Sequence, residues 1–522
     1  MSESSPTVAT KGAQKKSTHT AFTATLLLMA STVASGALGL VRTKYINHIF
    51  GAGAATDAYN NAFNLPDMLG YFLVGGVASI SLITILNRSR ENGEDENEAL
   101  SAVLNAMVLV LGAAIVLAEI FAPLYTRVMF PKMSAESAAM CTRLTRIMLP
   151  QPLLLFIGGV LGARLLVRKI FVYQAVTPLI YNLGIIFGAA VLSRWFGIYG
   201  LGLGVVVGAL AGPALMTAFG AARSGMRYRP IFKLNHPAFR EWLRLSFPLM
   251  IGLSLTYADK WILSYYSSGV EGAISRLSVA KLLFNVPMSM LGGAAGAASL
   301  PFFSALFTQG KHEEFAAAVN RAISRVMAAS LLIGAWLIAL SFPVVDLFRG
   351  GSFTATDTAE TAQYLRIFAV AIAVWAVQAL YSRSFYAAGN TLTPAITGWV
   401  VTAISIPVYA LLFSAKGVPG LAMASGVGML LSVIALAVLL DRMKLVPLRG
   451  LEFGELARAL LAAVLSGVAA WWVLGRMHMA RGHSADLIAI AAGTAVWAAV
   501  CLGVLLGTGS KLPKQLLRRR AG

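Results

Sequence analysis

The chain has 522 residues, of which 57% are hydrophobic and only 12% are charged. Soluble domains carry about 25% charged residues, so this composition excludes a soluble protein, and the apolar content excludes a disordered one. The remaining charge is unbalanced, with 42 Lys and Arg against 22 Asp and Glu and a formal net charge of +20. In a membrane protein such an excess first indicates cytoplasmic loops rather than nucleic-acid binding.

Membrane-spanning helices need about 20 apolar residues each, and runs of that kind recur along the whole chain. Fourteen spans are predicted, at 21–41, 58–86, 100–123, 143–163, 174–193, 196–220, 244–266, 278–306, 323–346, 362–387, 393–413, 417–440, 455–475 and 485–506. The first run follows three lysines, as a cleaved signal peptide would, but it is too long for one. We therefore predict an all-α polytopic membrane protein of about 14 transmembrane helices.

Basic residues gather in the segments that a cytoplasmic N-terminus would place inside the cell. They lie in the loop at 164–169, the linker at 223–244, the segment 442–458 and the tail from Lys511 onward. Cytoplasmic loops are enriched in Lys and Arg, and these residues set the orientation of the chain. The sequence therefore predicts that both termini are cytoplasmic, where the basic segments also meet anionic membrane lipids.

The chain also repeats itself weakly. Asn64–Pro66 corresponds to Asn285–Pro287, and Thr177–Pro178 corresponds to Thr393–Pro394, at offsets of 221 and 216 residues. The alternative explanation of these matches is that unrelated polytopic proteins share a similar loop composition. Each repeat holds six helices, and an even number gives both halves the same orientation, with a site between them. The predicted segments are a basic cytoplasmic tail (1–20), an N-lobe (21–220), a basic cytoplasmic linker (221–243), a C-lobe (244–440), two further helices (441–510) and a basic cytoplasmic tail (511–522).

Polar side chains interrupt the second span. Asp57, Asn60, Asn61 and Asn64 occupy positions i, i+3, i+4 and i+7, which fall on one face of a helix. Because polar groups facing lipid have no partner, this stripe indicates a cavity. Arg42, near the outer end of the first span, supplies a forked donor that suits phosphate. The alternatives are snorkelling of Arg42, an Arg42–Asp57 ion pair, and asparagines that only join helices.

A second polar set lies in the seventh and eighth spans. Asp259 and Lys260 are adjacent and point about 100° apart, so each needs its own partner. Lys281 and Asn285 are four residues apart and share a helix face. Polar groups thus come from the first two spans of each half, and four such helices can enclose one cationic, amide-lined cavity.

The sequence contains no residue pattern typical of an enzyme active site or a metal centre. Cys141 and Cys501 stand far apart, and the six histidines show no metal-ligand spacing. We therefore predict that the protein is not an enzyme and has no catalytic residue, no metal site and no cofactor. The expected driving force is the membrane potential or a monovalent cation.

Several segments resemble the MurJ/MviN family of lipid II flippases. They are ALGLVRTKYINHIFGAG (37–53), IFGAGAATDAYNNAFNLPDML (49–69), SLPFFSALFTQGKHEEF (299–315) and FYAAGNTLTP (385–394). The segment YADKWILSYYSSG (257–269) is similar to one in related polysaccharide exporters. The resemblance covers essentially the whole chain. It implies a divergent member of the multidrug/oligosaccharidyl-lipid/polysaccharide flippase superfamily, with two six-helix lobes in a V and a lipid groove formed with the two C-terminal helices.

The resemblance also assigns individual residues. Arg42 matches the family's important arginine after the first span, and Asp57 matches the aspartate of its ATDAF block. Asp259 matches an acidic residue that some members use near a sodium site. Positions where members commonly carry arginine hold Gly36, Gly70 and Leu282 in this chain.

Residues and resemblance together predict a flippase of the bacterial inner membrane that moves undecaprenyl-pyrophosphate-linked lipid II by alternating access. Arg42, Lys260 and Lys281 are expected to bind phosphate, and Asp259 is the candidate for ion coupling. The remaining substrate-binding candidates are Asp57, Asn60, Asn61, Asn64 and Asn285. Expected partners are lipid II, anionic lipids and cell-wall synthesis proteins, with no nucleic acid. The alternatives are an exporter of another polyprenyl-linked glycan, favoured by the missing arginines, and a non-transporting scaffold whose basic loops recruit cell-wall or division proteins.

Overall fold

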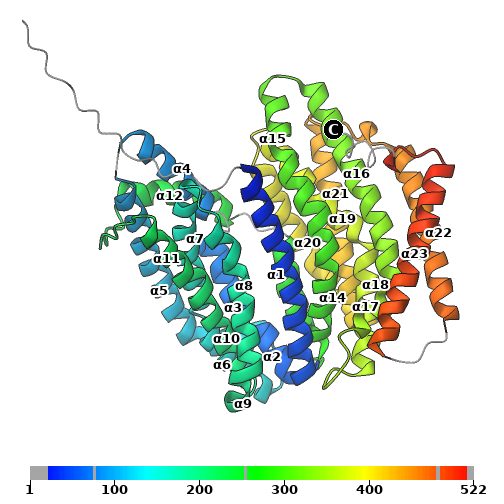
Figure 1. Cartoon of the computed structure of the whole chain (residues 1–522), viewed down its shortest axis with the longest axis horizontal. Helices are drawn as coiled ribbons and strands as arrows, with labels where there is room; N and C mark the ends of the chain where they lie inside the picture. The colour runs from blue at the N-terminus through cyan, green and yellow to red at the C-terminus, as the bar shows by residue number, and fades with distance from the viewer. Residues whose placement is uncertain (1–20, 75–77, 94, 252–254, 478–481, 514–522) are drawn as a thin grey trace, which may run out of the picture.

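The structure, a computed structural model, describes residues 21–74, 78–93, 95–251, 255–477 and 482–513. Helices run side by side in two lobes with an additional helix pair on the outside of one of them (Figure 1). Across these residues the only extended pairing is an isolated bridge between Gly350 and Phe353. The predicted tail at 1–20 and the last residues of the predicted C-terminal tail lie outside the described residues.

The N-lobe is built from the first half of the chain. Its helices are α1 (Ala21–Phe50), α2 (Ala54–Ala62), α3 (Asn64–Leu69), α4 (Ala78–Glu91), α5 (Glu96–Met129), α6 (Ala135–Met148), α7 (Gln151–Val167), α8 (Val172–Phe187), α9 (Ser193–Phe196), α10 (Tyr199–Ala209) and α11 (Thr217–Arg223). Two buried apolar clusters fill this lobe, one centred on Leu100 and Phe156 and the other on Leu144 and Leu201.

The C-lobe and the outer pair follow in the second half. The helices are α12 (Pro237–Ile251), α13 (Leu255–Ser267), α14 (Ala273–Met288), α15 (Ala294–Thr308), α16 (His312–Ala339), α17 (Ser341–Asp346), α18 (Ala355–Val370), α19 (Ile372–Ala387), α20 (Leu392–Lys416), α21 (Val418–Arg442), α22 (Phe453–Arg476) and α23 (His483–Gly507). The last two form the outer pair, and they pack against α16. Indole groups join them to it, because Trp336 Nε1 donates to Thr494 Oγ1 (2.9 Å) and Trp497 Nε1 donates to the Leu332 carbonyl (3.1 Å).

The predicted polytopic all-α fold is confirmed. Within the described residues, ten helical runs are long and apolar enough to cross a membrane, and α18 with α19 forms a further span bent by 46°. Within the described residues, the predicted second and eighth spans are interrupted near the polar residues singled out above. The second is broken by the turn at Phe63 and by the π-helical residues Gly70–Val74, and the eighth by the π-helical residues Ser289–Gly293.

Prolines account for two of these breaks. Pro66 is followed by a π-helical turn, η1 (Gly70–Val74), and Pro287 by another, η4 (Ser289–Gly293). Proline removes a backbone donor and crowds the preceding turn, so a helix that continues past it adopts a wider turn or a kink. The two turns occupy corresponding places in the two lobes, as the repeated Asn-x-Pro motif predicts.

Helix α12 lies with the N-lobe, although the predicted C-lobe begins at residue 244. Trp242 is fully buried and contacts Phe156 edge-on and Phe239 in a stack, each with ring centroids 6.0 Å apart. Helix α12 therefore packs on α4 and α5, and contact with the C-lobe begins at α13, which packs on α20 and α21. The crossing between lobes falls in the middle of the predicted seventh span.

The lobes meet at the end of the bundle opposite the start of α1 and the end of α23 (Figure 1). There the Ser352 amide donates to the His48 carbonyl (2.9 Å), and the Ala54 amide donates to Glu271 Oε1 (3.2 Å). These contacts hold the end of α1 and the start of α2 against the C-lobe. The cavity described next lies between the lobes and is closed on this side.

Candidate functional site: a cavity between the lobes

A cavity of about 620 Å³ lies between the two lobes, lined by residues of α1, α2, α13 and α14. Its volume falls in the range of about 300–1,000 Å³ that is usual for small-molecule sites. Six of the nine predicted site residues line it, namely Arg42, Asn60, Asp259, Lys260, Lys281 and Asn285. The first two spans of each half therefore do meet around one polar space.

Arg42 is held by neutral groups. Its Nη1 donates to Asn182 Oδ1 (2.9 Å), and the Asn182 amide nitrogen in turn donates to Ser35 Oγ (3.1 Å). Within the described residues no carboxylate pairs with Arg42, and the alternative Arg42–Asp57 ion pair is absent. The positive charge is thus oriented but not neutralised, which leaves it available to an anion in the cavity.

Asp57 faces the start of α14 rather than the cavity. Its Oδ2 accepts a hydrogen bond from the Gly272 amide (2.6 Å), and its Oδ1 accepts from the Ser275 amide (2.8 Å) and Ser275 Oγ (2.6 Å). A carboxylate is favoured at a helix N-terminus because the first amides lack intrahelical partners. Gly272 has φ +76°, and a side chain there would meet the Ala52 carbonyl oxygen at 2.4 Å. Asp57 therefore acts as an N-terminal cap that one lobe supplies to the other.

The asparagine stripe is divided between the cavity and the protein interior. Asn60 lines the cavity, and its Nδ2 donates to Ser275 Oγ (3.3 Å). Asn61 and Asn64 are buried away from it, and none of their amide atoms has a hydrogen-bond partner within the described residues. Helix α2 ends at Ala62 and α3 begins at Asn64, so the predicted i, i+3, i+4, i+7 face does not continue as one surface.

Lys260 reaches across the cavity to the N-lobe. Its Nζ lies 2.5 Å from Asp67 Oδ2 on α3, and 5.6 Å from the centre of the Phe63 ring. Both members of this pair are about half exposed, at 48% and 41%. Exposed ion pairs contribute only about 0–1 kcal/mol, so the contact is easily exchanged for an anionic ligand.

Lys281 is enclosed by the C-lobe. Its Nζ lies 2.9 Å from Asp259 Oδ2 and 3.1 Å from Ser425 Oγ. The Tyr409 hydroxyl donates to the other oxygen of Asp259. Three aromatic rings surround the ammonium, with centroids at 3.9 Å (Trp375), 4.4 Å (Phe368) and 5.3 Å (Phe284). As predicted, Asp259 and Lys260 have separate partners, and the partner of Asp259 is an ammonium that the chain itself supplies.

Three positions lack the family's arginines. A side chain added at Gly36 or Gly70 would meet no atom within 4 Å, so neither glycine is required by close packing. Leu282 lines the cavity beside Lys281. Neither glycine is among the residues that line the cavity, so of the three positions only Leu282 bears directly on its charge.

Sequence reasoning did not identify several groups of the site. Asp67 stands in the quoted motif 49–69 and pairs with Lys260, but it falls off the face of the asparagine stripe. Asn182 and Tyr409, the partners of Arg42 and Asp259, come from distant helices and carry no local signal. The aromatic residues around Lys281 come from α14, α18 and α19, and only Phe284 shares its helix.

Two helical lobes around a polar, cationic cavity define a membrane transporter of the kind built from two halves. The family described as "Lipid II flippase MurJ" matches residues 46–490. This chain belongs to that family, and it is a transporter rather than an enzyme.

Individual relatives agree with this assignment. The "Probable lipid II flippase MurJ" of Bdellovibrio bacteriovorus is 26% identical over 455 residues, which are 84% of this chain and 85% of that protein. The "Lipid II flippase MurJ" of Burkholderia cenocepacia is 26% identical over 530 residues, which cover 96% of this chain and 99% of that protein.

Solved structures support the fold. A structure titled "Lipid II flippase MurJ, inward closed conformation" superposes with a TM-score of 0.75 at 24% identity, covering 92% of this chain and 99% of that one. An inward-facing multidrug transporter of the MATE family gives a TM-score of 0.64 at 15% identity, covering 81% of this chain and 98% of that one. These structures confirm the fold, and the family match over residues 46–490 confirms the predicted resemblance.

Proposed function

We propose that this protein is a lipid II flippase, which moves an undecaprenyl-pyrophosphate-linked peptidoglycan precursor across the bacterial inner membrane. The observation that carries the proposal is the interlobe cavity, in which, among the described residues, Arg42 has no carboxylate partner and Lys260 has only an exposed one. Such cations suit a pyrophosphate. Membership of the flippase family supplies the substrate class.

In this proposal the pyrophosphate lies between Arg42 and Lys260, and Asn60 and Asn285 hydrogen-bond the sugars. Lys281 adds long-range positive potential while it remains paired with Asp259. The polyprenyl tail stays in the bilayer along α22 and α23. Asp57 takes no part in binding and instead holds α2 to α14 while the cavity is open to the other side.

The orientation of the chain in the membrane follows from the distribution of its basic residues. Basic segments gather at the end of the bundle that carries the start of α1 and the end of α23, and we assign this end to the cytoplasm. The cavity, closed at the opposite end, then faces inward. Transport consists of breaking the Asp57 contacts as one lobe rocks against the other.

Coupling is proposed to use the membrane potential or a monovalent cation, with no cofactor. The candidate element is the buried Asp259–Lys281 pair, because a change in its pairing would alter the charge buried inside the C-lobe.

The direct test is complementation of a bacterial strain depleted of its own lipid II flippase. The wild-type chain is expected to restore peptidoglycan synthesis, and Arg42→Gln with Lys260→Gln is expected to lose most of that ability at equal protein level. Native mass spectrometry of the purified chain is expected to detect bound polyprenyl-pyrophosphate lipid. A well-folded wild-type chain that fails in both assays would contradict the proposal.

The missing arginines favour one other substrate, a different polyprenyl-linked glycan. Gly36, Gly70 and Leu282 stand where the resemblance implies arginines, so the chain carries fewer cations than the family pattern. Deletion of the gene would then remove a surface glycan while growth stays normal. The scaffold alternative is less well supported, because Arg229 of the basic linker is already paired with Asp95 (2.5 Å) and Glu98 (3.2 Å).

A further inference from the structure

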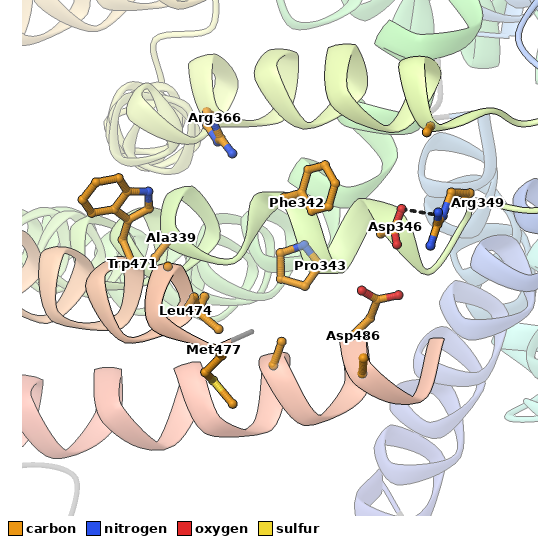
Figure 2. A pocket seen from close by; sticks show the side chains of 14 residues that line it. Ala339, Phe342, Pro343, Asp346, Arg349, Arg366, Trp471, Leu474, Met477 and Asp486 are labelled. Carbon is orange, nitrogen blue, oxygen red and sulfur yellow. Dashed lines mark ion pairs between the residues drawn. The ribbon is translucent and has the colours of Figure 1, made fainter. Parts of the chain in front are cut away.

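The guanidinium of Arg42 is held differently from that of Arg349, which lines another cavity. This second cavity, of about 450 Å³, lies between the C-lobe and the outer helix pair (Figure 2). There Arg349 Nε pairs with Asp346 Oδ1 at 2.9 Å, so a carboxylate neutralises the guanidinium. The side chain that takes this place beside Arg42 is Asn182 of α8, which is 7% exposed and carries no charge.

The carboxamide of Asn182 has one orientation that satisfies its hydrogen bonds. Its Nδ2 donates to the Pro178 carbonyl oxygen (3.0 Å), one turn earlier on α8, and to Ser35 Oγ (3.1 Å) on α1. The opposite orientation would place two oxygens together and an N–H group beside the guanidinium. Oδ1 therefore faces Arg42 and accepts from its Nη1 at 2.9 Å.

Helices α1 and α8 are also joined at a second level. The Ser31 hydroxyl donates to the Ala175 carbonyl, and the two helices pack against each other. Both contacts lie within the N-lobe, so they move together with Arg42 when one lobe rocks against the other. Asn182 therefore holds the guanidinium in either arrangement of the lobes.

The C-lobe contains a corresponding arrangement. Asp259, in the first span of that lobe, accepts a hydrogen bond from the Tyr409 hydroxyl of α20. Helices α8 and α20 carry the repeated Thr-Pro motif (177–178 and 393–394), so they are equivalent elements of the two lobes. In each lobe, a neutral group of this helix thus orients a charged side chain of the first span.

The neutrality of Asn182 matters for an anionic ligand. Its carboxamide uses one N–H of Arg42 Nη1, and the Nε–Nη2 edge of the guanidinium has no protein partner among the described residues. That edge supplies two parallel donors, which match a phosphate. A carboxylate in the place of the carboxamide would form an ion pair with the guanidinium and compete with the phosphate for its charge.

We propose that Asn182 is a positioning residue of the pyrophosphate site: it fixes the guanidinium of Arg42 and, because it is neutral, leaves the positive charge to the ligand. The inference rests on the proposed function, since it concerns the same site. It predicts that affinity for a pyrophosphate depends on the charge at this position as well as on the hydrogen bond.

The test is binding of undecaprenyl pyrophosphate to the full chain in nanodiscs. Asn182→Asp keeps the size of the side chain and an oxygen beside Arg42 but adds a negative charge. We expect it to weaken binding about tenfold or more, as the loss of a charged hydrogen bond predicts. Asn182→Leu removes the hydrogen bonds without adding charge and is expected to weaken binding only about threefold.

A double variant separates this role from general damage to the N-lobe. In an Arg42→Gln background, Asn182→Asp is expected to have little further effect on binding, because the group that it acts on is gone. The matched control is Asn105→Asp. Asn105 is also a buried N-lobe asparagine, but its Nδ2 donates to the carbonyls of Arg229 (3.1 Å) and Ile231 (3.2 Å), and it does not line the cavity. This control is expected to bind as the wild type does.

The outcomes distinguish the inference from the proposed function. If the wild type binds but Asn182→Asp binds equally well, or no more weakly than Asn182→Leu, Asn182 has only a structural role and the inference is wrong. If Asn182→Asp does not fold, unchanged binding in Asn182→Leu would overturn the inference by itself. A folded wild-type chain that binds no undecaprenyl pyrophosphate would contradict the proposed function, and the inference with it.

Discussion

Asp57 of the N-lobe caps the helix that begins beside Ser275 of the C-lobe, with its Oδ1 2.8 Å from the Ser275 amide nitrogen. The residues are more than two hundred positions apart, and their contact joins the lobes at the closed end of the interlobe cavity. A single buried carboxylate thus satisfies the first turn of α14 only while the lobes are together. When they part, those amides and that carboxylate need water instead.

Asp57→Asn is expected to loosen the closed end. The amide keeps the size of the side chain but loses the charge that α14 favours, and hydrogen bonds to charged groups contribute about 1.5–3 kcal/mol. Disulfide formation between cysteines placed at Lys132 of the N-lobe and Gly269 of the C-lobe is expected to fall in this variant, because a Cβ atom at position 269 would lie 2.8 Å from that of Lys132. The background protein should lack Cys141 and Cys501, which are both buried.

The matched control is Asp95→Asn. Asp95 also caps a helix, since it accepts from the Asn97 amide (2.9 Å) at the start of α5, but both residues belong to the N-lobe. This variant should leave the cross-linking yield unchanged. If both substitutions lowered the yield equally, the effect would reflect helix stability and not the contact between the lobes.

Lys281→Met is expected to destabilise the C-lobe strongly. The substitution leaves Asp259, whose side chain is 4% exposed, as an unpaired buried charge, and breaking such a pair costs about 3–5 kcal/mol. Thermal unfolding followed by size-exclusion chromatography would measure the loss. The double variant Lys281→Met with Asp259→Asn should recover most of the stability, and a double variant as unstable as the single one would contradict this account.

The Asp259–Lys281 ion pair also predicts how the stability of the protein responds to sodium. In the wild type an internal ammonium occupies the carboxylate of Asp259, so added sodium chloride should not stabilise the protein more than potassium or choline chloride. In Lys281→Gln the vacated carboxylate can accept a free cation, and sodium is expected to raise its melting temperature selectively. Selective stabilisation of the wild type by sodium would mean that the ion binds elsewhere or displaces the lysine.

Lys260 and Asp67 are expected to affect function more than stability. Because both side chains are about half exposed, either neutral variant should change the free energy of unfolding by less than about 1 kcal/mol. Lys260→Gln should weaken binding of a polyprenyl pyrophosphate, whereas Asp67→Asn should strengthen it by freeing the ammonium. Binding to protein in nanodiscs would measure both, and weaker binding in Asp67→Asn would show that the ion pair orders the site.

Arg42→Lys tests whether geometry or charge matters at the first span. Lysine keeps the charge but cannot both donate to Asn182 and present a fork to phosphate. Complementation by Arg42→Lys is therefore expected to fall between that of the wild type and that of Arg42→Gln. A lysine variant equal to the wild type would reduce the role of Arg42 to charge alone.

Much of the fold could be predicted because it depends on local composition. Runs of apolar residues determine which segments span, and the prolines at 66 and 287 mark two of the interruptions. The separate partners of Asp259 and Lys260 followed from helical geometry alone. Gathering of polar groups from the first two spans of each half followed from the repeat.

The individual contacts could not be predicted, because periodicity defines a face of a helix but not what that face meets. The face of Asp57 meets the N-terminus of α14, and Asn61 and Asn64 are buried away from the cavity. The sequence predicted Lys281 as a phosphate ligand, because the residues next to it do not indicate that Phe368 and Trp375 pack around its ammonium group. These outcomes depend on how distant helices dock.

Closure at one end also has a mechanical consequence. Helix α1 has 30 residues and is therefore about 45 Å long, at about 1.5 Å per residue. With its last turn tied to the C-lobe through His48 and Ser352, each degree of tilt moves its first turn by about 0.8 Å. A small change in the tilt of α1 about its last turn therefore produces a large displacement of its first turn. The open end of the cavity can then widen for a bulky headgroup with little rearrangement inside either lobe.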